Sequence, residues 1–362
     1  MLLFLLHIVV FLLGASLIVY TLGSAIRTFV LPRSSADMLS FMVFLVIFRI
    51  ISIGLIPVHA YERKDRIMAF YAPVSLLALP VVWLALVLVG YMGMFWALGV
   101  SSWWVAFTVS GSSLLTLGFA QVNDFFKILL TFSEAAIGLL LVALLISYLP
   151  TMYSAFSRRE TAVTMLAVRA GTPPSAVTML TRYYSLQKLD KLTQLWETWE
   201  MWFADIEESH TSLAALSFYR SPRPQNSWIT AAGAVLDAAS LITSTVDVPH
   251  DPQADLCIRA GFLALRHIAD FFSIPHNPNP QPEDPIRITR EEYDVACDEL
   301  ARQGIPLKAD REQAWRDFAG WRVNYDTVLI GLATLTMAPE ARWSSDRRLP
   351  TISSSLKLRR KR

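Results

Sequence analysis

The sequence has only two cysteines, Cys257 and Cys297, among 362 residues, and they do not have the spacing of metal ligands. This argues against a disulfide framework, and a reducing compartment fits the chain best. Phosphate-binding glycine loops, metal-ligand clusters and nucleophile elbows are also missing from residues 151–362. We therefore do not expect an enzyme.

Charge is scarce in the first part of the chain. Residues 1–150 contain seven Lys or Arg and five Asp or Glu, whereas residues 151–362 contain the other 25 of each sign. With 54% apolar residues and a mean hydropathy of +0.41, this split predicts a membrane-embedded half followed by a soluble half. The net charge is only +2 and acids are interspersed with bases, which argues against nucleic-acid binding.

Three apolar runs are long enough to cross about 30 Å of hydrocarbon. Residues 2–22 carry no charged side chain, and residues 69–100 end in an aromatic group typical of a membrane interface. Residues 125–149 form the third run, which we expect to close at Tyr148-Leu149-Pro150. These runs predict three transmembrane helices.

A fourth apolar run, residues 38–58, is ambiguous because Arg49 lies near its centre. If the run spans, the arginines before it lie on the opposite side of the membrane from those after it. If it lies along the inner face, all of them are cytoplasmic, as the positive-inside rule prefers. The rule favours the second arrangement, and the first stays open.

The connection between the last two spans, residues 101–124, is much longer than the usual helix connection of about 2–8 residues. It contains an apolar stretch suited to a half-length helix, Trp103 to Val109, followed by the segment Ser112 to Gln121. Non-helical backbone at membrane depth persists only where it is buried in protein or lines a water-filled path. We expect a re-entrant pore loop here; the alternative is an ordinary polar turn between two transmembrane helices.

This order of segments resembles the pore module of potassium channels, which has an outer helix, a pore helix, a filter ending in Thr-x-Gly-aromatic, and an inner helix with a glycine. The resemblance covers residues 69–156, and the whole chain is similar to bacterial potassium-channel-like proteins with helical tails. It implies four copies around an axis, with backbone carbonyls of Thr116, Leu117, Gly118 and Phe119 replacing the hydration shell of potassium or another monovalent cation. No cofactor besides the permeant ion is implied.

Two positions depart from the pattern of that family. The second filter glycine is replaced by Ala120, and the acidic residue that follows it is replaced by Gln121. An alanine in a left-handed conformation costs about 1–2 kcal/mol, so the outer rim must absorb this strain or adopt a different backbone. Potassium selectivity is therefore implied less firmly than a pore. A non-conducting membrane receptor or scaffold that retains the pore fold is the alternative function.

Three further residues of the pore module carry hypotheses. A ring of four Glu134 side chains could concentrate cations in the cavity or support the filter; the alternative is a protonated glutamic acid bonded to a pore helix. Gly138 lies four residues later on the same helix face and is either a gating hinge or a close helix contact. Asp124 either decorates the outer mouth with Gln121 or caps the inner helix.

The soluble half is expected to contain about six amphipathic helices. Thr172-Pro173 and Asp251-Pro252 predict helix starts, and Thr289 to Glu292 has the sequence of a capping box. The tryptophan-rich stretch that begins at Trp196 has helical spacing and predicts a core-facing stripe. Residues 229–246 are apolar, but we expect a buried helix there rather than a further span.

The sequence therefore predicts an all-α membrane protein with a potassium-channel-like transmembrane pore module and a helical cytoplasmic C-terminal domain. We expect it in the bacterial inner membrane as a homotetramer in the lipid bilayer, with a cytoplasmic ligand or protein partner left open. The expected regions are an N-terminal transmembrane helix (1–33), an interfacial or embedded connecting segment (34–68), the pore module (69–156), the helical domain (157–345) and a basic disordered tail (346–362).

Overall fold

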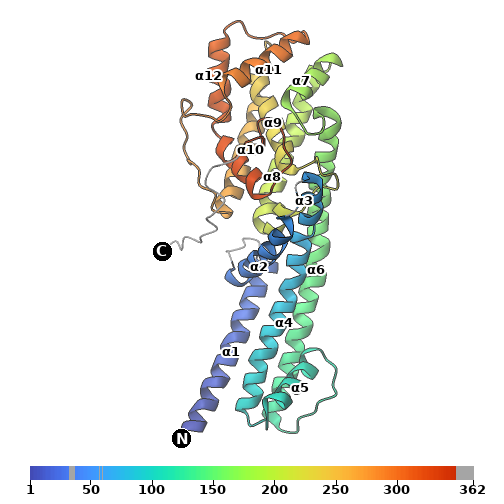
Figure 1. The fold of residues 1–362 in the computed structure, drawn as a ribbon, viewed down its shortest axis with the longest axis vertical. Coiled ribbons are helices and arrows are strands. Elements are labelled where there is room, and N and C mark those ends of the chain that lie inside the picture. Colours follow the sequence, from blue (N-terminus) through green and yellow to red (C-terminus); the bar gives the residue numbers. More distant parts are fainter. Residues whose placement is uncertain (32–36, 57, 59, 348–362) are drawn as a thin grey trace. The chain divides into compact units, whose positions relative to one another are not determined.

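The computed structural model describes residues 1–31, 37–56, 58 and 60–347 (Figure 1). Within these ranges the chain is helical and contains no strand; the one isolated β-bridge joins Val246 and Leu307. By length and composition, four helical segments could cross a membrane, which fits the expected all-helical membrane protein. They are α1 (Leu2–Phe29), α2 (Met38–Leu55), Tyr61–Ala97, which comprises α3 (Tyr61–Met68) and α4 (Tyr71–Ala97), and α6 (Phe125–Ala170).

The chain divides into two compact units. The first comprises residues 1–59 and 67–154, and the second comprises residues 60–66 and the chain from residue 155 onwards. The division falls within α6, two residues before the boundary expected at residue 156. Of the expected basic tail, residues 348–362 lie outside the described residues.

Helices α1 and α4 pack closely in the first unit because glycine faces glycine at their contact. A Cβ atom on Gly14 would lie 2.5 Å from the carbonyl oxygen of Gly90, and one on Gly90 would lie 2.8 Å from the side chain of Ile18. Small residues let the backbones of membrane helices approach, and dispersion contacts then hold the pair together. Neither glycine can be enlarged without moving one of the two helices.

The start of α2 is attached to α1 by a polar cluster around Asp37. The carboxylate caps α2 by accepting from the backbone N–H of Ser40 at 3.0 Å. It also accepts from the hydroxyl of Ser24 at 2.5 Å and pairs with Arg27 at 2.9 Å. Because the indole of Trp83 on α4 donates to Ser24 as well, the cluster connects three helices. The start of α2 is therefore held to α1 by the contacts of Asp37 with Ser24 and Arg27.

Helix α6 does not end where the sequence predicted. It continues through Pro150 to Ala170 and is 46 residues long, so the expected closure at Tyr148-Leu149-Pro150 is wrong. A proline removes one backbone hydrogen bond, but neighbouring turns and hydroxyl side chains can compensate in a long helix. Pro150 leaves the carbonyl of Ile146 without its helical donor, and the rest of α6 continues on both sides of this one missing bond.

The second unit contains seven α-helices after α6 in its described part, against about six expected. Asp251 and Thr289 cap helices as predicted, and the Thr289–Glu292 capping box is complete. The start at Thr172-Pro173 is wrong, because the chain first makes a turn and Ser175 is the N-cap. The helices are α7 (Ala176–Ser185), α8 (Leu192–Ser212), α9 (Trp228–Ser244), α10 (Pro252–Phe271), α11 (Arg290–Arg302), α12 (Arg311–Arg322) and α13 (Asp326–Leu335), with short 3-10 helices η1 (Leu189–Lys191) and η2 (Ala214–Phe218).

The core of the second unit is built around α9, which contacts α7, α10, α12 and α13. Sixteen of its 17 residues are buried, so the expectation of a buried helix rather than a further span is confirmed. The predicted stripe of α8 is also confirmed, since Trp196, Trp199 and Phe203 are buried in the same core. A helix that is apolar on every face is stable only when other helices surround it.

Candidate functional site

The long connection between α4 and α6 contains a half-length helix, as predicted, but it continues past the expected end at Val109, so that Ser112 to Leu114 of the expected loop are helical. Helix α5 (Trp103–Leu114) has 12 residues, compared with 27 in α4. Ser102 caps its start by accepting from the N–H of Val105 at 3.2 Å. The indole of Trp103 stacks on that of Trp96 at 5.1 Å, so the start of α5 lies at the end of α4.

The end of α5 lies about half way along the apolar part of α6. A Cβ atom on Gly138 would overlap the carbonyl oxygen of Leu114, so the two backbones touch. Gly138 is 13 residues after Phe125, which corresponds to roughly 20 Å along the helix axis at about 1.5 Å per residue. The hydroxyl of Ser110 on α5 lies 3.2 Å from the carbonyl oxygen of Leu88, which is on α4, nine residues before the end of that helix. Helix α5 thus returns between α4 and α6 and stops part of the way.

The contact at Gly138 bears on the two roles considered for this residue. The absence of a side chain permits the approach of α5, which is the role of a close helix contact rather than a demonstrated hinge.

The loop after α5 is held by Ser112, which sequence reasoning did not select. Its carbonyl oxygen accepts from the backbone N–H of Leu117 at 2.8 Å. Its hydroxyl oxygen accepts from the backbone N–H of Ala120 at 3.1 Å. Ser112 is itself buried, and its bond to Ala120 is partly buried. Its place in the last turn of the half-length helix is the signal that could have identified it, since the carbonyls there lack helical partners.

The backbone of the loop turns at Thr116 and Gly118, whose φ angles are +55° and +72°. Ala120 is not among the residues with positive φ, so the strain expected at this position is not present. The two residues with a left-handed backbone are Gly118 and Thr116, which lie two and four residues before Ala120. At Gly118 this conformation has no steric cost, because glycine lacks a Cβ atom. The departure of Ala120 from the family pattern therefore carries no backbone penalty in this conformation.

The proposed filter residues are exposed in the single chain. Thr116, Leu117, Gly118 and Phe119 are all exposed, with Leu117 and Phe119 at 61% and 65%. A Cβ atom added at Gly118 would meet no neighbouring atom. The loop therefore presents apolar side chains and backbone on a surface that the single chain leaves uncovered.

Glu134 is buried against α5 rather than exposed on α6. Its exposed fraction is 0%, and Oε1 accepts from the hydroxyl of Ser110 at 2.5 Å, while Oε2 has no protein partner. Of the two interpretations considered above, this geometry supports hydrogen bonding to a pore helix, here that of the same chain. The side chain does not line a surface on which a ring of four carboxylates could face a cavity.

Asp124 caps α6. Its Oδ1 atom accepts from the backbone N–H groups of Phe126 at 3.1 Å and Lys127 at 3.3 Å, which supports the capping interpretation. Asp124 and Gln121 are both exposed in the loop, so a place at a mouth stays a prediction for both.

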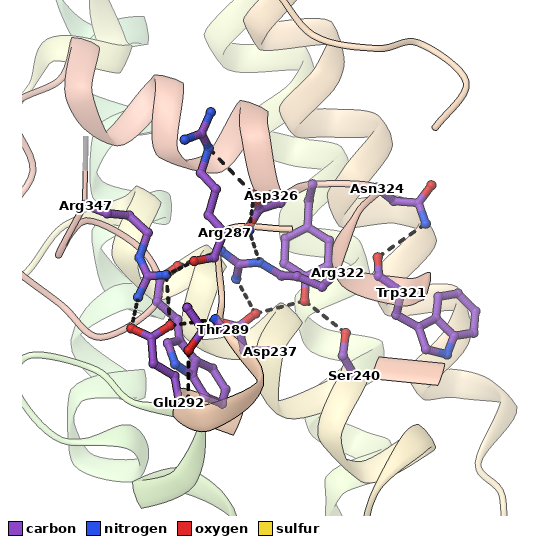
Figure 2. Close-up of polar contacts among 12 residues, drawn as sticks. Asp237, Ser240, Arg287, Thr289, Glu292, Trp321, Arg322, Asn324, Asp326 and Arg347 are labelled. Carbon is purple, nitrogen blue, oxygen red and sulfur yellow. Dashed lines mark hydrogen bonds and ion pairs between the residues drawn. The ribbon is translucent and has the colours of Figure 1, made fainter. Parts of the chain in front are cut away.

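The second unit holds a buried ionic cluster (Figure 2). Arg322 on α12 bonds Asp237 on α9 at 2.5 Å and Asp326 on α13 at 2.8 Å, and its third nitrogen donates to the carbonyl of Trp343 at 2.6 Å. Tyr325 donates to Asp237 at 2.9 Å. Burial alone would lower the pKa of Arg322, but the two carboxylates raise it above its ordinary value, so the guanidinium keeps its charge.

This cluster is a structural feature rather than a reaction site. Its charged members are at most 2% exposed, and the guanidinium nitrogens all have acceptors, so there is neither room nor an open coordination position for a ligand. Across the described residues there is also no group of three or more His, Cys, Asp and Glu placed to hold a metal ion.

A second buried charge lies on α6 shortly after the unit boundary. The guanidinium of Arg159 pairs with Glu160 at 2.8 Å and donates to the carbonyls of Leu216 and Tyr219 at 2.8 Å each. It also contacts Nε2 of His210 at 3.2 Å. Because a guanidinium can only donate, Nε2 accepts and the imidazole is neutral with its proton on Nδ1. Burial and the positive charge of Arg159 hold the pKa of His210 well below its ordinary 6.5.

In comparisons with known proteins, no protein-family model, no curated protein and no solved structure matches the chain.

Proposed function

We propose that four copies of this chain form a cation channel in which the backbone carbonyls of Thr116 to Phe119 line the path of the ion. The proposal is supported most by one observation: a half-length helix stops near the middle of α6 and is followed by a non-helical loop that the single chain leaves exposed. An ordinary turn between two spans would lie beyond the ends of α4 and α6. Here α5 instead returns along both.

The need to satisfy backbone groups favours further copies around this loop. Unpaired N–H and C=O groups in hydrocarbon cost several kcal/mol each, so such a loop is stable in a membrane only against protein or water. Ser112 accepts from the N–H groups of Leu117 and Ala120, whereas no hydrogen bond to a carbonyl of Thr116 to Phe119 is present among the described residues. Carbonyls that converge on a central axis can take dehydrated cations as that partner.

Potassium is the cation we favour, because the segment resembles the potassium channel filter. By the same resemblance the protein would reside in a bacterial inner membrane, and the positive-inside rule favours a cytoplasmic location for the charged C-terminal unit. That helical unit would then serve assembly or regulation. The exposed apolar side chains of Leu117 and Phe119 would pack against neighbouring copies.

The alternative is a receptor or scaffold that keeps the pore fold without conducting. Reconstitution of the purified full chain into liposomes separates the two functions. Reversal potentials under opposed potassium and sodium gradients should show cation selectivity if the channel proposal holds, whereas impermeable liposomes would favour the scaffold. The mass of the complex in detergent must correspond to four chains, because a monomer cannot enclose a central path.

A pair of glycine variants tests the role of the filter backbone itself. Gly118 and Gly99 both have positive φ, at +72° and +83°, and a Cβ atom on either would meet no neighbour. Alanine therefore imposes the same backbone strain of about 1–2 kcal/mol at both positions. Gly118→Ala should change conductance or selectivity, while Gly99→Ala, which lies before α5, should not. Equal effects of the two would contradict the assignment of the filter.

A further inference from the structure

Helix α3 is tethered within reach of the membrane surface. It follows α2, which ends at Leu55, and only Ala69 and Phe70 separate it from the apolar helix α4. Two residues extend the chain by at most about 7 Å. If α4 lies in the bilayer, α3 cannot move far from the headgroup region.

One side of α3 is attached to the second unit, to which residues 60–66 belong. Asp65 pairs with Arg220 at 3.2 Å, and these side chains are only 9% and 11% exposed. Tyr61, one turn earlier, donates its hydroxyl to the carbonyl of Met337 at 3.3 Å, and Arg220 donates to the same carbonyl at 2.8 Å.

The remaining positions of α3 carry unneutralised positive charge. Arg63 and Arg66 are exposed and lie three residues apart, which places them on one face of the helix. Lys64 is half-buried and projects from a different side, because residues one or two positions apart do not face each other. None of the three side chains has an ion pair or a hydrogen bond to another described residue. Asp65 is already neutralised by Arg220, so Glu62 is the one carboxylate of α3 left to offset three cations.

Exposed cations of this kind are usually solvated by water, but the short connection to α4 favours their contact with lipid. A basic side chain held near a membrane gains from anionic lipid without the entropy cost of first bringing the protein to the surface. The attraction falls off within a Debye length, about 8 Å at physiological ionic strength, which is comparable to the length of the tether. Tyr61 and Asp65 lie four residues apart on the attached side of α3, so Arg63 and Arg66 project from its other side.

We propose that Arg63, Lys64 and Arg66 bind the phosphate headgroups of anionic phospholipids. The partner is thus a lipid surface, recognised by charge and not by a shaped pocket. The inference needs α4 to lie in a bilayer, but it holds whether or not the chain conducts ions.

The test is native mass spectrometry of the full chain released from detergent with added lipid. We compare adducts of phosphatidylglycerol with those of phosphatidylcholine for the wild type and for a variant carrying Arg63→Gln, Lys64→Gln and Arg66→Gln. The wild type should prefer phosphatidylglycerol, and the variant should lose that preference by roughly tenfold or more, given the surface attraction per basic residue.

A matched control removes the same charge elsewhere. Lys188, Arg259 and Arg302 are exposed in the second unit and form no ion pair with another described residue, so their triple glutamine variant should bind lipid like the wild type. A charge-preserving variant, Arg63→Lys with Arg66→Lys, should also keep the preference, and retained helical circular dichroism should exclude misfolding. An unchanged preference in the α3 variant would overturn the proposal, as would competition by inorganic phosphate at constant ionic strength.

Discussion

The hydroxyl of Ser110 on α5 donates a 2.5 Å hydrogen bond to the carboxyl group of Glu134 on α6. Glu134 is completely buried, and its other oxygen has no protein partner. The same hydroxyl lies 3.2 Å from the carbonyl oxygen of Leu88 on α4, so the two acceptors share its single proton and α5 contacts both long helices of the proposed pore module. Removal of the Ser110 hydroxyl therefore tests how firmly α5 is held.

Replacing Ser110 by alanine should destabilise the first unit by about 1–3 kcal/mol, because a buried carboxyl group then loses its donor. The measurement is the thermal unfolding midpoint of the purified protein in detergent. Ser113→Ala is the matched control, since that hydroxyl bonds only the carbonyl of Val109 in its own helix. Equal shifts for the two variants would show that the bond to Glu134 does not hold α5.

Gly138→Ala should displace the end of α5, because the new Cβ atom overlaps the carbonyl oxygen of Leu114. Overpacking of this kind costs about 1–3 kcal/mol. We expect lower stability together with altered ion flux in liposomes, since the displaced residue directly precedes the loop. Gly111→Ala is the control, as its Cβ atom would first meet a side-chain atom of Leu88 at 4.0 Å. Normal ion flux in the Gly138 variant would show that conduction does not depend on the position of α5.

Arg322→Met should destabilise the second unit by about 3–5 kcal/mol, because two buried carboxylates would be left without their cation. Chemical denaturation followed by tryptophan fluorescence measures the effect, since the buried tryptophans of α8 report on this core. Arg302→Met removes an exposed arginine from α11 and should change the unfolding free energy by less than about 0.5 kcal/mol. A similar small change for Arg322 would mean that the cluster in Figure 2 contributes little.

Acid should destabilise the second unit through His210. The folded protein keeps this imidazole neutral because its pKa is held well below 6.5, whereas the unfolded chain takes up the proton near pH 6.5. The unfolding free energy should therefore be unaffected above that pH and should fall below it, by up to about 1.4 kcal/mol per pH unit, until the folded-state pKa is reached.

His210→Gln removes this titration and should flatten the pH dependence of unfolding below about pH 6.5. The amide oxygen of glutamine can still accept from Arg159, so the variant keeps an acceptor for the guanidinium. An unchanged slope for the His210 variant would place the acid sensitivity elsewhere.

Much of the architecture could be predicted from local signals. The half-length helix of the pore module, the buried helix α9 and the caps at Asp251 and Thr289 all follow from short stretches of sequence. The wrong predictions concern helix ends and starts at two prolines, where the usual local effect of proline did not decide the structure. Pro150 usually ends a helix, yet α6 continues through it, and Thr172-Pro173 forms a turn before the true cap at Ser175.

The candidate site was predictable only in part. Thr116 and Gly118 were selected for their residue types, and both turn out to be the left-handed positions of the loop. The contacts that hold the loop were not predictable, because Ser110 and Ser112 belong to a serine-rich string with no distinctive pattern. Their roles depend on residues up to 24 positions away in the chain.

The sequence by itself determined that the chain has an apolar half and a charged half, because hydropathy and charge are sums over residues that need no partner. It also determined the half-length helix, since the break between apolar runs is local. Only the tertiary structure decided that Glu134 is buried behind α5 and that Gly138 is a contact for Leu114. Helical periodicity defines which residues share a face, but the element that covers that face is chosen by packing between distant segments.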